Sequence, residues 1–108
     1  MVNLEEINRE VIAIMKQHYG DRLAKIVLFG SYARGDFDEE SDVDFAIVIT
    51  SDNVHPRIER RAYRLALTDL SLRYNKAIST LPVSAEAFYA SENFLMDQIH
   101  QNSITIYG

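Results

Sequence analysis

The chain has 108 residues, 47% of them hydrophobic, and a formal net charge of −5. This length and composition predict a single domain over residues 1–108 with one apolar core. The sequence contains no cysteine, which excludes a disulfide framework and a thiolate zinc site and is typical of a reducing, cytoplasmic setting. The negative charge would repel a polyphosphate backbone, so we expect no direct nucleic-acid partner. We also expect no membrane association, because no stretch is long and apolar enough to cross a bilayer.

The first half of the chain predicts one helix and two strands. Apolar residues recur at helical spacing over residues 4–18, with Asn3 as the N-cap and Gly20 as the stop signal. Residues 26–29 are apolar and β-rich, which predicts a short buried strand. Residues 43–49 predict a second strand, which has two carboxylates at its start and a polar turn at its end.

The second half predicts a long helix, a third strand and a short last helix. The long helix begins at Pro56 and extends to about residue 74. Its apolar stripe is expected to consist of Ile58, Ala62, Leu65, Ala66 and Leu70. The remaining segments are a strand over residues 77–83, a helical turn opened by residues 84–86, a helix over residues 91–101, and an edge strand or docked tail over residues 104–107.

The order helix, strand, strand, helix, strand, helix predicts an α+β domain of two layers. In this fold class, helices pack on a small β-sheet and share one core with it. The order of the elements leaves the topology of the sheet open. The sequence shows no repeat, linker or low-complexity segment.

The polar segment after the first strand has the properties of a phosphate-binding turn. Gly30 follows the buried strand directly, and glycine lets the backbone approach a ligand that a Cβ would block. The amides of a turn that leads into a helix favour anions, and the hydroxyl of Ser31 can donate to a phosphate oxygen. Arg34, one turn later, can add a charged guanidinium fork. These three residues are the candidate nucleotide-binding residues.

Two carboxylates at the start of the second strand form a candidate metal site. Asp42 and Asp44 are separated by one residue, so in a strand their side chains lie on the same face, while Val43 points into the core. Neighbouring carboxylates repel each other unless a cation joins them, and Mg²⁺ is usually held by one or two carboxylates together with substrate phosphates. Such a site can activate an attacking hydroxyl and stabilise a leaving pyrophosphate. Asp42 and Asp44 are therefore the candidate catalytic and metal-binding residues.

Each half of this pattern also has a purely structural interpretation. A Gly-Ser pair after a strand is usually a simple turn, and an Asp-x-Asp at a strand start is most often a solvated pair or a cap. The chance of both at this spacing in a chain of this length is on the order of one in a thousand. The combination therefore favours a functional site.

Gly30-Ser31, followed by ten residues and then by Asp42 and Asp44, resembles the signature of the minimal nucleotidyltransferases, or MNT proteins, of the DNA polymerase β-like superfamily. The resemblance covers nearly the whole chain, and its specific motif lies in residues 30–49. It implies a polymerase β-like palm fold with a small mixed sheet. It also implies transfer of AMP from ATP to a hydroxyl, with the Gly-Ser pair on the phosphates and the two aspartates on Mg²⁺.

The resemblance also implies a partner. MNT proteins commonly act as antitoxins of all-helical HEPN toxins, so we expect a HEPN-type toxin to bind this chain. The implied acceptor is a tyrosine of that toxin, and the implied activity is AMPylation within a toxin–antitoxin system. A homo-oligomer and a hetero-oligomer with the toxin are both compatible with this interpretation. An acidic antitoxin also suits an RNA-cleaving toxin whose active surface is basic.

The chain departs from the superfamily pattern in one respect. The superfamily often places a third carboxylate on the strand after the long helix, but residues 78–83 contain none. Asp69, on the preceding helix, is expected to face solvent or to act as a cap. Three alternatives stay open: an enzyme with two carboxylates, an enzyme that takes a base from its acceptor, or a catalytically weak or inactive binding antitoxin. Transfer to a small molecule such as an aminoglycoside is less favoured, because the chain has little room for a second substrate-binding domain.

Several side chains outside this motif allow more than one interpretation. Arg57, Arg61 and Arg64 share one face of the long helix, which is either a solvated face or a basic patch for phosphates or an acidic partner. Tyr32 is expected to pack beside the nucleotide or to line the cleft. The three histidines show no metal-site spacing and are assigned no role. The apolar C-terminal residues are expected in the core or, where exposed, in a protein interface, and they are Phe88, Tyr89, Phe94, Leu95 and Ile99.

Overall fold

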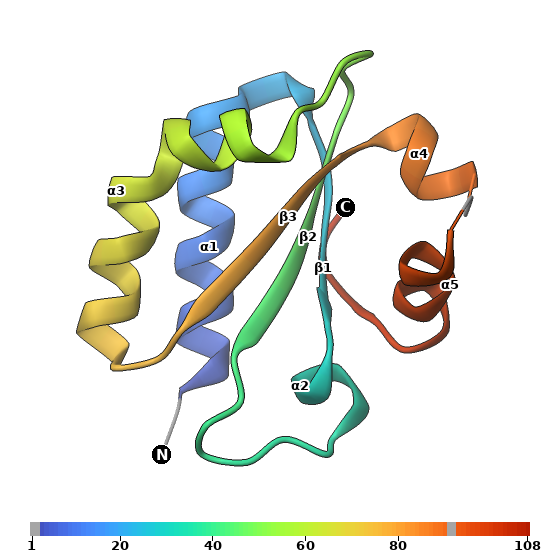
Figure 1. Cartoon of the computed structure of the whole chain (residues 1–108). Coiled ribbons are helices and arrows are strands. Elements are labelled where there is room, and N and C mark those ends of the chain that lie inside the picture. The colour runs from blue at the N-terminus through green and yellow to red at the C-terminus, as the bar shows by residue number, and fades with distance from the viewer. Residues whose placement is uncertain (1–2, 91–92) are drawn as a thin grey trace.

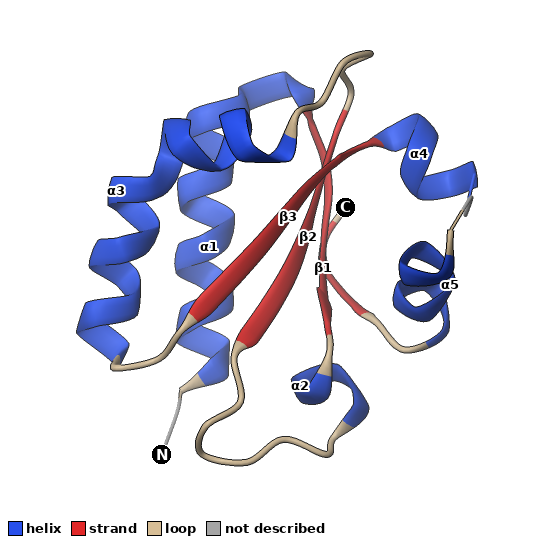
Figure 2. Cartoon of the chain, viewed as in Figure 1, coloured by secondary structure: helices blue, strands red, loops and turns tan. Residues whose placement is uncertain are grey.

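A computed structural model describes residues 3–90 and 93–108 of the chain. At its centre lies a four-stranded mixed sheet with the strand order β3-β2-β1-β4 (Figure 1, Figure 2). β1 (Leu23–Phe29) pairs antiparallel with β2 (Val43–Ile49) and with β4 (Ile104–Tyr107), whereas β3 (Ile78–Ser84) runs parallel to β2. Parallel strands need a long crossover connection, and a helix provides it here.

Helices lie on both faces of the sheet (Figure 1). α1 (Leu4–Tyr19) and α3 (Pro56–Tyr74) pack side by side on one face, and α4 (Ala85–Ala90) and α5 (Phe94–Gln101) lie on the other. Two single turns, η1 (Gly20–Arg22) and α2 (Ser31–Arg34), flank β1. The α+β class, with helices packed on a small mixed sheet, is confirmed, but the predicted two layers are wrong, because helices cover both faces of the sheet and make three layers. Among the described residues, no helix combines the length and the apolar character that a membrane crossing requires.

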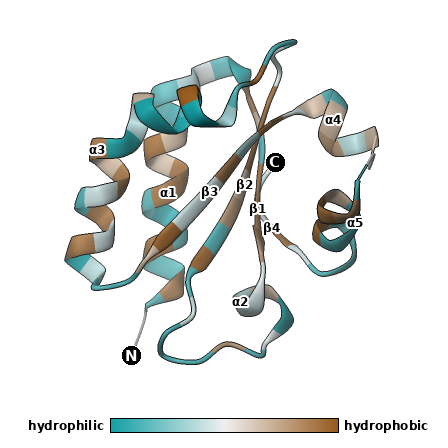
Figure 3. Ribbon diagram, viewed as in Figure 1, coloured by the Kyte–Doolittle hydropathy of each residue, from teal (hydrophilic) through white to brown (hydrophobic). Residues whose placement is uncertain are grey.

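β2 is buried on both faces, which explains its nearly continuous apolar sequence (Figure 3). Val43 and Phe45 are 0% exposed and belong to the core between the sheet and α1 and α3. Ala46 and Val48, also 0% exposed, belong to the smaller cluster that contains residues of α4 and α5. Because side chains alternate along a strand, Asp44 shares the face of Ala46. Asp44 therefore lies on the sheet face opposite α1 and α3.

The bounds of α3 agree with the sequence prediction, but most of its predicted apolar stripe is wrong. Ile58 is 59% exposed and Leu65 is 85% exposed, and both alanines of the stripe are exposed as well. The face that packs on the sheet is instead formed by Tyr63, Leu67 and Leu70. Tyr63 tolerates burial because its hydroxyl forms a hydrogen bond to β3. Apolar residues occur on two faces of α3, and periodicity alone selected the wrong one.

The ends of the other elements follow the predicted signals closely. The side chain of Asn3 accepts a hydrogen bond from the amide of Glu6 at 3.1 Å, and Gly20, with a φ of 56°, ends α1. β1 begins at Leu23 rather than at residue 26. Of the predicted last helix, residues 94–101 are α5, and residues 91–92 lie outside the described residues. The C-terminal segment is an edge strand on β1 rather than a docked tail.

The apolar residues of the C-terminal region divide into a buried and an exposed group. Phe88 and Ile99 are 3% and 1% exposed and complete the smaller cluster under α4 and α5. Tyr89, Phe94 and Leu95 are 60%, 77% and 45% exposed. The core role is therefore confirmed for the buried group, while an interface role for the exposed group stays a prediction.

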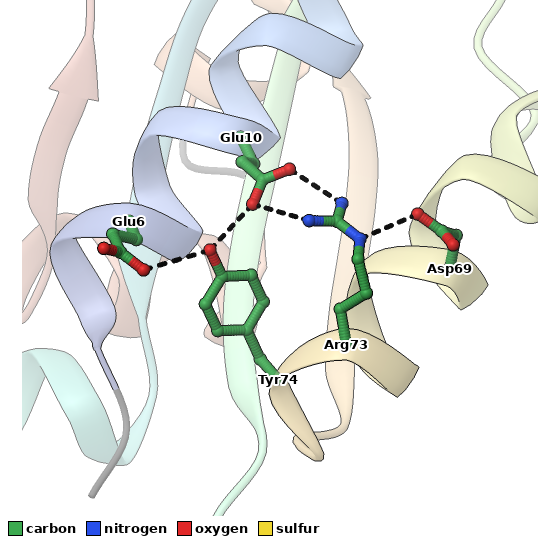
Figure 4. A network of polar contacts seen from close by, with 5 residues as sticks. All are labelled: Glu6, Glu10, Asp69, Arg73 and Tyr74. Carbon is green, nitrogen blue, oxygen red and sulfur yellow. Dashed lines mark hydrogen bonds and ion pairs between the residues drawn. The ribbon is translucent and has the colours of Figure 1, made fainter.

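A polar network joins α1 to the end of α3 (Figure 4). Arg73 donates to both carboxylate oxygens of Glu10, at 2.7 and 2.9 Å, and to Asp69 at 2.9 Å. The hydroxyl of Tyr74 donates to Glu10 at 2.8 Å and to Glu6 at 3.1 Å. Asp69 thus faces solvent, as predicted, with its side chain 66% exposed. The network fixes the end of α3, from which the chain turns into β3.

Candidate active site

The strand register brings the glycine turn and the two aspartates together. Phe29, the last residue of β1, is the register partner of Asp44 in β2, so the turn at Gly30 begins beside the Asp44 carboxylate. Gly30 has a φ of 73°, and a Cβ at this position would overlap that carboxylate. Only glycine satisfies both the left-handed backbone and the close approach. From the sequence, we expected a ligand to fill the space beside Gly30. In the structure, the Asp44 carboxylate fills part of that space.

The groups assigned to phosphate binding lie in and around α2. Gly30 is the N-cap of this single turn, and Gly35, with a φ of 85°, ends it. The first amides of a helix have no acceptor within the helix, and Ser31 at this position is half-buried. Arg34 is exposed and donates from Nε to Asp36 at 3.2 Å, and its positive charge partly offsets the rise in the pKa of Asp44 that burial and Asp42 cause. Arg34 thus follows the glycine turn directly and is paired with the loop that leads to the aspartates.

Asp42 and Asp44 flank a fully buried Val43, as the alternation of a strand requires. Asp42 is exposed and Asp44 is half-buried. The pKa of Asp44 is raised, first by burial and second by the negative charge of Asp42. A divalent cation would relieve this repulsion, and carboxylate oxygens are the ligands that Mg²⁺ prefers. The two residues therefore fit a metal ion that is shared with substrate phosphates.

The position beside Asp44 on the neighbouring strand is occupied by Ser79. Ser79 is the register partner of Asp44 in the parallel pair of β2 and β3, and its side chain is exposed. This is a place on the strand after the long helix where a third carboxylate could act. Within residues 3–90 and 93–108, no group of three or more histidine, aspartate or glutamate side chains is arranged to hold a metal ion. Among these residues, the candidate site therefore contains two carboxylates.

The acidic loop between α2 and β2 is held by its own hydrogen bonds. The carboxylate of Asp38 accepts from the amide of Glu40 at 2.9 Å, and the amide of Asp38 donates to the hydroxyl of Ser41 at 2.9 Å. The backbone amide of Ser41 in turn donates to the carbonyl of Asp38 at 3.2 Å. The hydrogen bonds of Asp38 therefore stabilise the turn that precedes Asp42 and the start of β2.

Lys76 is a residue of the site that the sequence interpretation missed. It is only 7% exposed, and its Nζ donates to the carbonyl of Glu39 at 2.8 Å. The same ammonium lies 5.3 Å from the ring centroid of Tyr32, which stacks on Phe37 with a centroid distance of 4.3 Å. Lys76 therefore connects the turn before β3 to both α2 and the acidic loop. A backbone carbonyl far away in sequence leaves no signal in periodicity or motif, so sequence alone could not identify this contact.

The nucleotidyltransferase domain model matches residues 8–96 of this chain, a range that includes every candidate site residue. The chain therefore belongs to the nucleotidyltransferase domain family and is an enzyme of the nucleotidyltransferase class. A relative from Methanocaldococcus jannaschii, named a "putative protein adenylyltransferase", is 37% identical over 102 residues, which are 94% of this chain and 91% of that protein. The family that the Gly-Ser and Asp-x-Asp spacing indicated is confirmed.

Two solved structures share the fold. A crystal structure of a toxin–antitoxin with AMP-PNP superposes with a TM-score of 0.67 and 20% identity, covering 94% of this chain and 73% of that chain. A crystal structure of a mutant of the toxin–antitoxin MntA-HpeT gives a TM-score of 0.65 and 17% identity, covering 94% of this chain and 72% of that chain. The predicted nucleotidyltransferase fold is thus confirmed.

Proposed function

We propose that this enzyme transfers AMP from ATP to a hydroxyl of a partner protein, with Asp42 and Asp44 as the ligands of Mg²⁺. The observation that carries the proposal is the register of β1 and β2, which sets Asp44 against the turn at Gly30. The name of the Methanocaldococcus jannaschii relative supports adenylyl transfer to a protein. The AMP-PNP in the structurally similar toxin–antitoxin supports an adenine nucleotide.

In the proposed reaction, the acceptor oxygen forms a bond to the α-phosphorus of ATP. The bond between that phosphorus and the oxygen of the leaving pyrophosphate breaks, and the hydroxyl loses its proton. The Ser31 hydroxyl, the first amides of α2 and the guanidinium of Arg34 would bind the phosphates and fix their direction. Bound Mg²⁺ supplies positive charge that offsets the repulsion between the acceptor oxygen and the phosphates. Positioning and electrostatics would thus provide most of the rate enhancement.

A base must accept the proton that the acceptor hydroxyl loses. Asp42 and Asp44 are committed to the metal in this proposal, and the residue beside Asp44 on β3 is Ser79. A serine hydroxyl is a poor base at neutral pH. We therefore propose that a group of the acceptor protein or solvent takes the proton.

The proposed acceptor is a tyrosine of a HEPN-type toxin, and the chain would be its antitoxin in a hetero-oligomer. Three observations support this assignment: the resemblance to MNT proteins, the toxin–antitoxin nature of the two similar solved structures, and the net charge of −5, which suits a basic partner. The setting would be cytoplasmic, with no direct contact to nucleic acid.

The test is the intact mass of the protein encoded beside this chain, after incubation with the chain, ATP and Mg²⁺. We expect a gain of one or more AMP units, and no gain with the Asp42→Asn variant. A stable complex without any mass gain would contradict the enzymatic proposal. Omission of Mg²⁺, and its replacement by Mn²⁺ or Ca²⁺, would identify the metal that supports the transfer.

A second candidate function is a binding antitoxin that neutralises its partner by covering it. The observation in its favour is Ser79 at the position beside Asp44, where a third carboxylate could act. Growth rescue in cells that express the partner toxin distinguishes the two candidates. If the variant Asp42→Asn/Asp44→Asn protects as well as the parent chain, binding alone is sufficient. If protection is lost while the complex still forms, transfer is required.

A further inference from the structure

A groove of about 860 Å³ lies between α3 and the start of β3, where these two elements run side by side (Figure 1). The N-terminal half of α3 lines the groove with arginines, and the C-terminal half lines it with neutral residues that include Leu72. On the other side, residues 77–80 form its wall. The phosphate turn and the two aspartates are not part of this lining, so the groove is a separate feature of the surface.

The arginines of the groove are Arg57, Arg60, Arg61 and Arg64. Their spacing of three and four residues puts all of them on one face of α3. Arg60 donates to the carbonyl of Thr80 at 3.2 Å. Arg57, Arg61 and Arg64 form no ion pair and no hydrogen bond with any residue that the structure describes. In a chain whose net charge is −5, this concentration of unneutralised positive charge indicates an anionic ligand.

One end of the groove reaches the candidate active site. Ser79 lines the groove and is also the register partner of Asp44. The carbonyl of Ala77, another lining residue, accepts a hydrogen bond from the amide of Val43 at 3.0 Å. Neighbouring strands lie about 4.8 Å apart. A ligand at this end of the groove is therefore about one strand spacing from the backbone of the aspartates, and it reaches the Asp44 side chain, which lies on the other face of the sheet, around the edge strand β3.

The surroundings of the groove favour a polypeptide over a polynucleotide. The loop next to Asp42 carries three acidic residues in a row, Asp38, Glu39 and Glu40, which would repel a continuous phosphate backbone. Leu72 lines the groove and is 76% exposed, which offers an apolar contact to a side chain. β3 is an edge strand of the sheet, and edge strands present unpaired backbone groups to a neighbouring chain.

We propose that this groove binds the acceptor polypeptide, with acidic side chains of the acceptor on Arg57, Arg61 and Arg64 and its hydroxyl residue at the Ser79 end. This inference rests on the proposed transfer of AMP to a protein. From Arg61 to Ser71 the axis of α3 rises by about 15 Å. An extended polypeptide covers this distance in about four or five residues. The preferred acceptor therefore carries its acidic residues about four or five positions from the modified hydroxyl.

The test measures peptide binding by fluorescence anisotropy without ATP, so that it does not depend on catalysis. Two labelled peptides are used, with a tyrosine, four alanines and three glutamates in either order. We expect one order to bind more tightly, and the variant Arg57→Gln/Arg61→Gln/Arg64→Gln to raise its Kd about tenfold. The control variant Arg9→Gln/Lys16→Gln/Arg22→Gln removes the same charge from exposed positions elsewhere. It should leave Kd within about twofold of the parent value, since exposed charges beyond a Debye length are screened.

The outcomes separate this inference from the proposed function. Equal loss of binding in both triple variants would overturn the groove assignment, because net charge alone would then explain it. Tighter binding of a single-stranded RNA of equal charge, lost in the groove variant, would overturn the polypeptide assignment. Peptide binding that depends on the groove arginines, without AMP transfer to any acceptor, would contradict only the enzymatic proposal. AMP transfer to the partner protein with the same KM in the groove variant would contradict only the groove.

Discussion

The ionised carboxylate of Asp44 is proposed to bind the metal, but its burial destabilises the metal-free fold. Its pKa is raised by burial and by Asp42, so the fold destabilises the ionised form that a metal needs, relative to the same carboxylate in the unfolded chain. We predict that Asp44→Asn raises the melting temperature of the metal-free protein by a few degrees at pH 7 and lowers AMP transfer by at least about 100-fold. Calorimetry in EDTA and the mass assay measure the two effects. A lower melting temperature in EDTA would show that the Asp44 carboxylate stabilises the metal-free fold.

Two glycines with positive φ provide a matched pair for testing the turn. At Gly30 a Cβ would overlap the Asp44 carboxylate, whereas at Gly35 no heavy atom lies within 4 Å of the added Cβ. Both substitutions to alanine carry backbone strain of about 1–3 kcal/mol. Only Gly30→Ala should also displace Asp44, so we predict that it lowers AMP transfer by about 100-fold or more while Gly35→Ala retains most of it. Equal loss in both variants at equal melting temperature would attribute the effect to strain rather than to the contact with Asp44.

The sequence identifies the residues of the candidate site better than it identifies their supports. Gly30, Asp42 and Asp44 follow from residue type and spacing, because each pattern is common alone but the two rarely occur together at this spacing. The contact between Gly30 and Asp44 depends on strand register, which spacing does not determine. Lys76 could not be found from sequence, because its acceptor is a backbone carbonyl that could belong to any residue.

At the scale of elements, Lys76 couples the turn before β3 to α2 and the acidic loop. Replacing it with methionine would keep most of the side-chain volume but remove the hydrogen bond to Glu39 and the contact of its charge with Tyr32. We predict that Lys76→Met destabilises the fold by roughly 1–3 kcal/mol and lowers kcat for transfer, with a smaller effect on KM for ATP. Urea unfolding and steady-state kinetics measure these effects. Unchanged kcat in a folded Lys76→Met variant would limit Lys76 to a structural role.

The network between α1 and α3 predicts a dependence of stability on pH. The pKa of Glu10 is lowered from its ordinary value of 4.5, mainly by its hydrogen bonds from Arg73 and Tyr74. A carboxylate with a lowered pKa in the folded state stabilises the fold fully above its unfolded pKa, and this contribution is lost as the pH falls through the folded pKa. We predict that Glu10→Gln has a lower melting temperature than the parent chain at pH 7, and that the difference shrinks below about pH 4.5. A difference that stays constant from pH 7 to pH 3 would contradict this origin.

The long helix shows why elements are easier to predict than their faces. Pro56 and the turn before it define its start, and these signals are local. Its buried face depends on what the sheet presents, and the hydroxyl pair of Tyr63 and Thr80, at 2.8 Å, selects a face that contains a tyrosine. The apolar residues Ile58 and Leu65 remain on the surface as a result. A pattern that counts only apolar residues cannot anticipate a buried polar contact between two elements.

At the scale of the whole molecule, two local concentrations of opposite charge lie near the candidate site. The acidic loop follows α2, while the arginine face of α3 lies beside β3 at the other edge of the site. A bound Mg²⁺–nucleotide would occupy the acidic side of the site. The positively charged groove would then be free to bind an anionic ligand. The length and composition of the chain predicted a single core. Predicting on which side of the sheet each charged group lies would also have required the strand order, which the sequence left open.

If residues 1–108 form one domain with one nucleotide site, as we propose, the chain should show a simple response to heat. Residues 1–108 should unfold in one cooperative transition, with equal calorimetric and van't Hoff enthalpies. ATP with Mg²⁺ at 100 times its Kd should stabilise the folded state by about 2.7 kcal/mol, because ligand binding to the native state adds RT ln(1 + [L]/Kd). For a domain of this size the melting temperature should rise by roughly 10 °C. Asp42→Asn should unfold with the same cooperativity but lose most of the rise with ATP and Mg²⁺, since the carboxylate pair is incomplete. Two separate transitions would contradict a single cooperative domain.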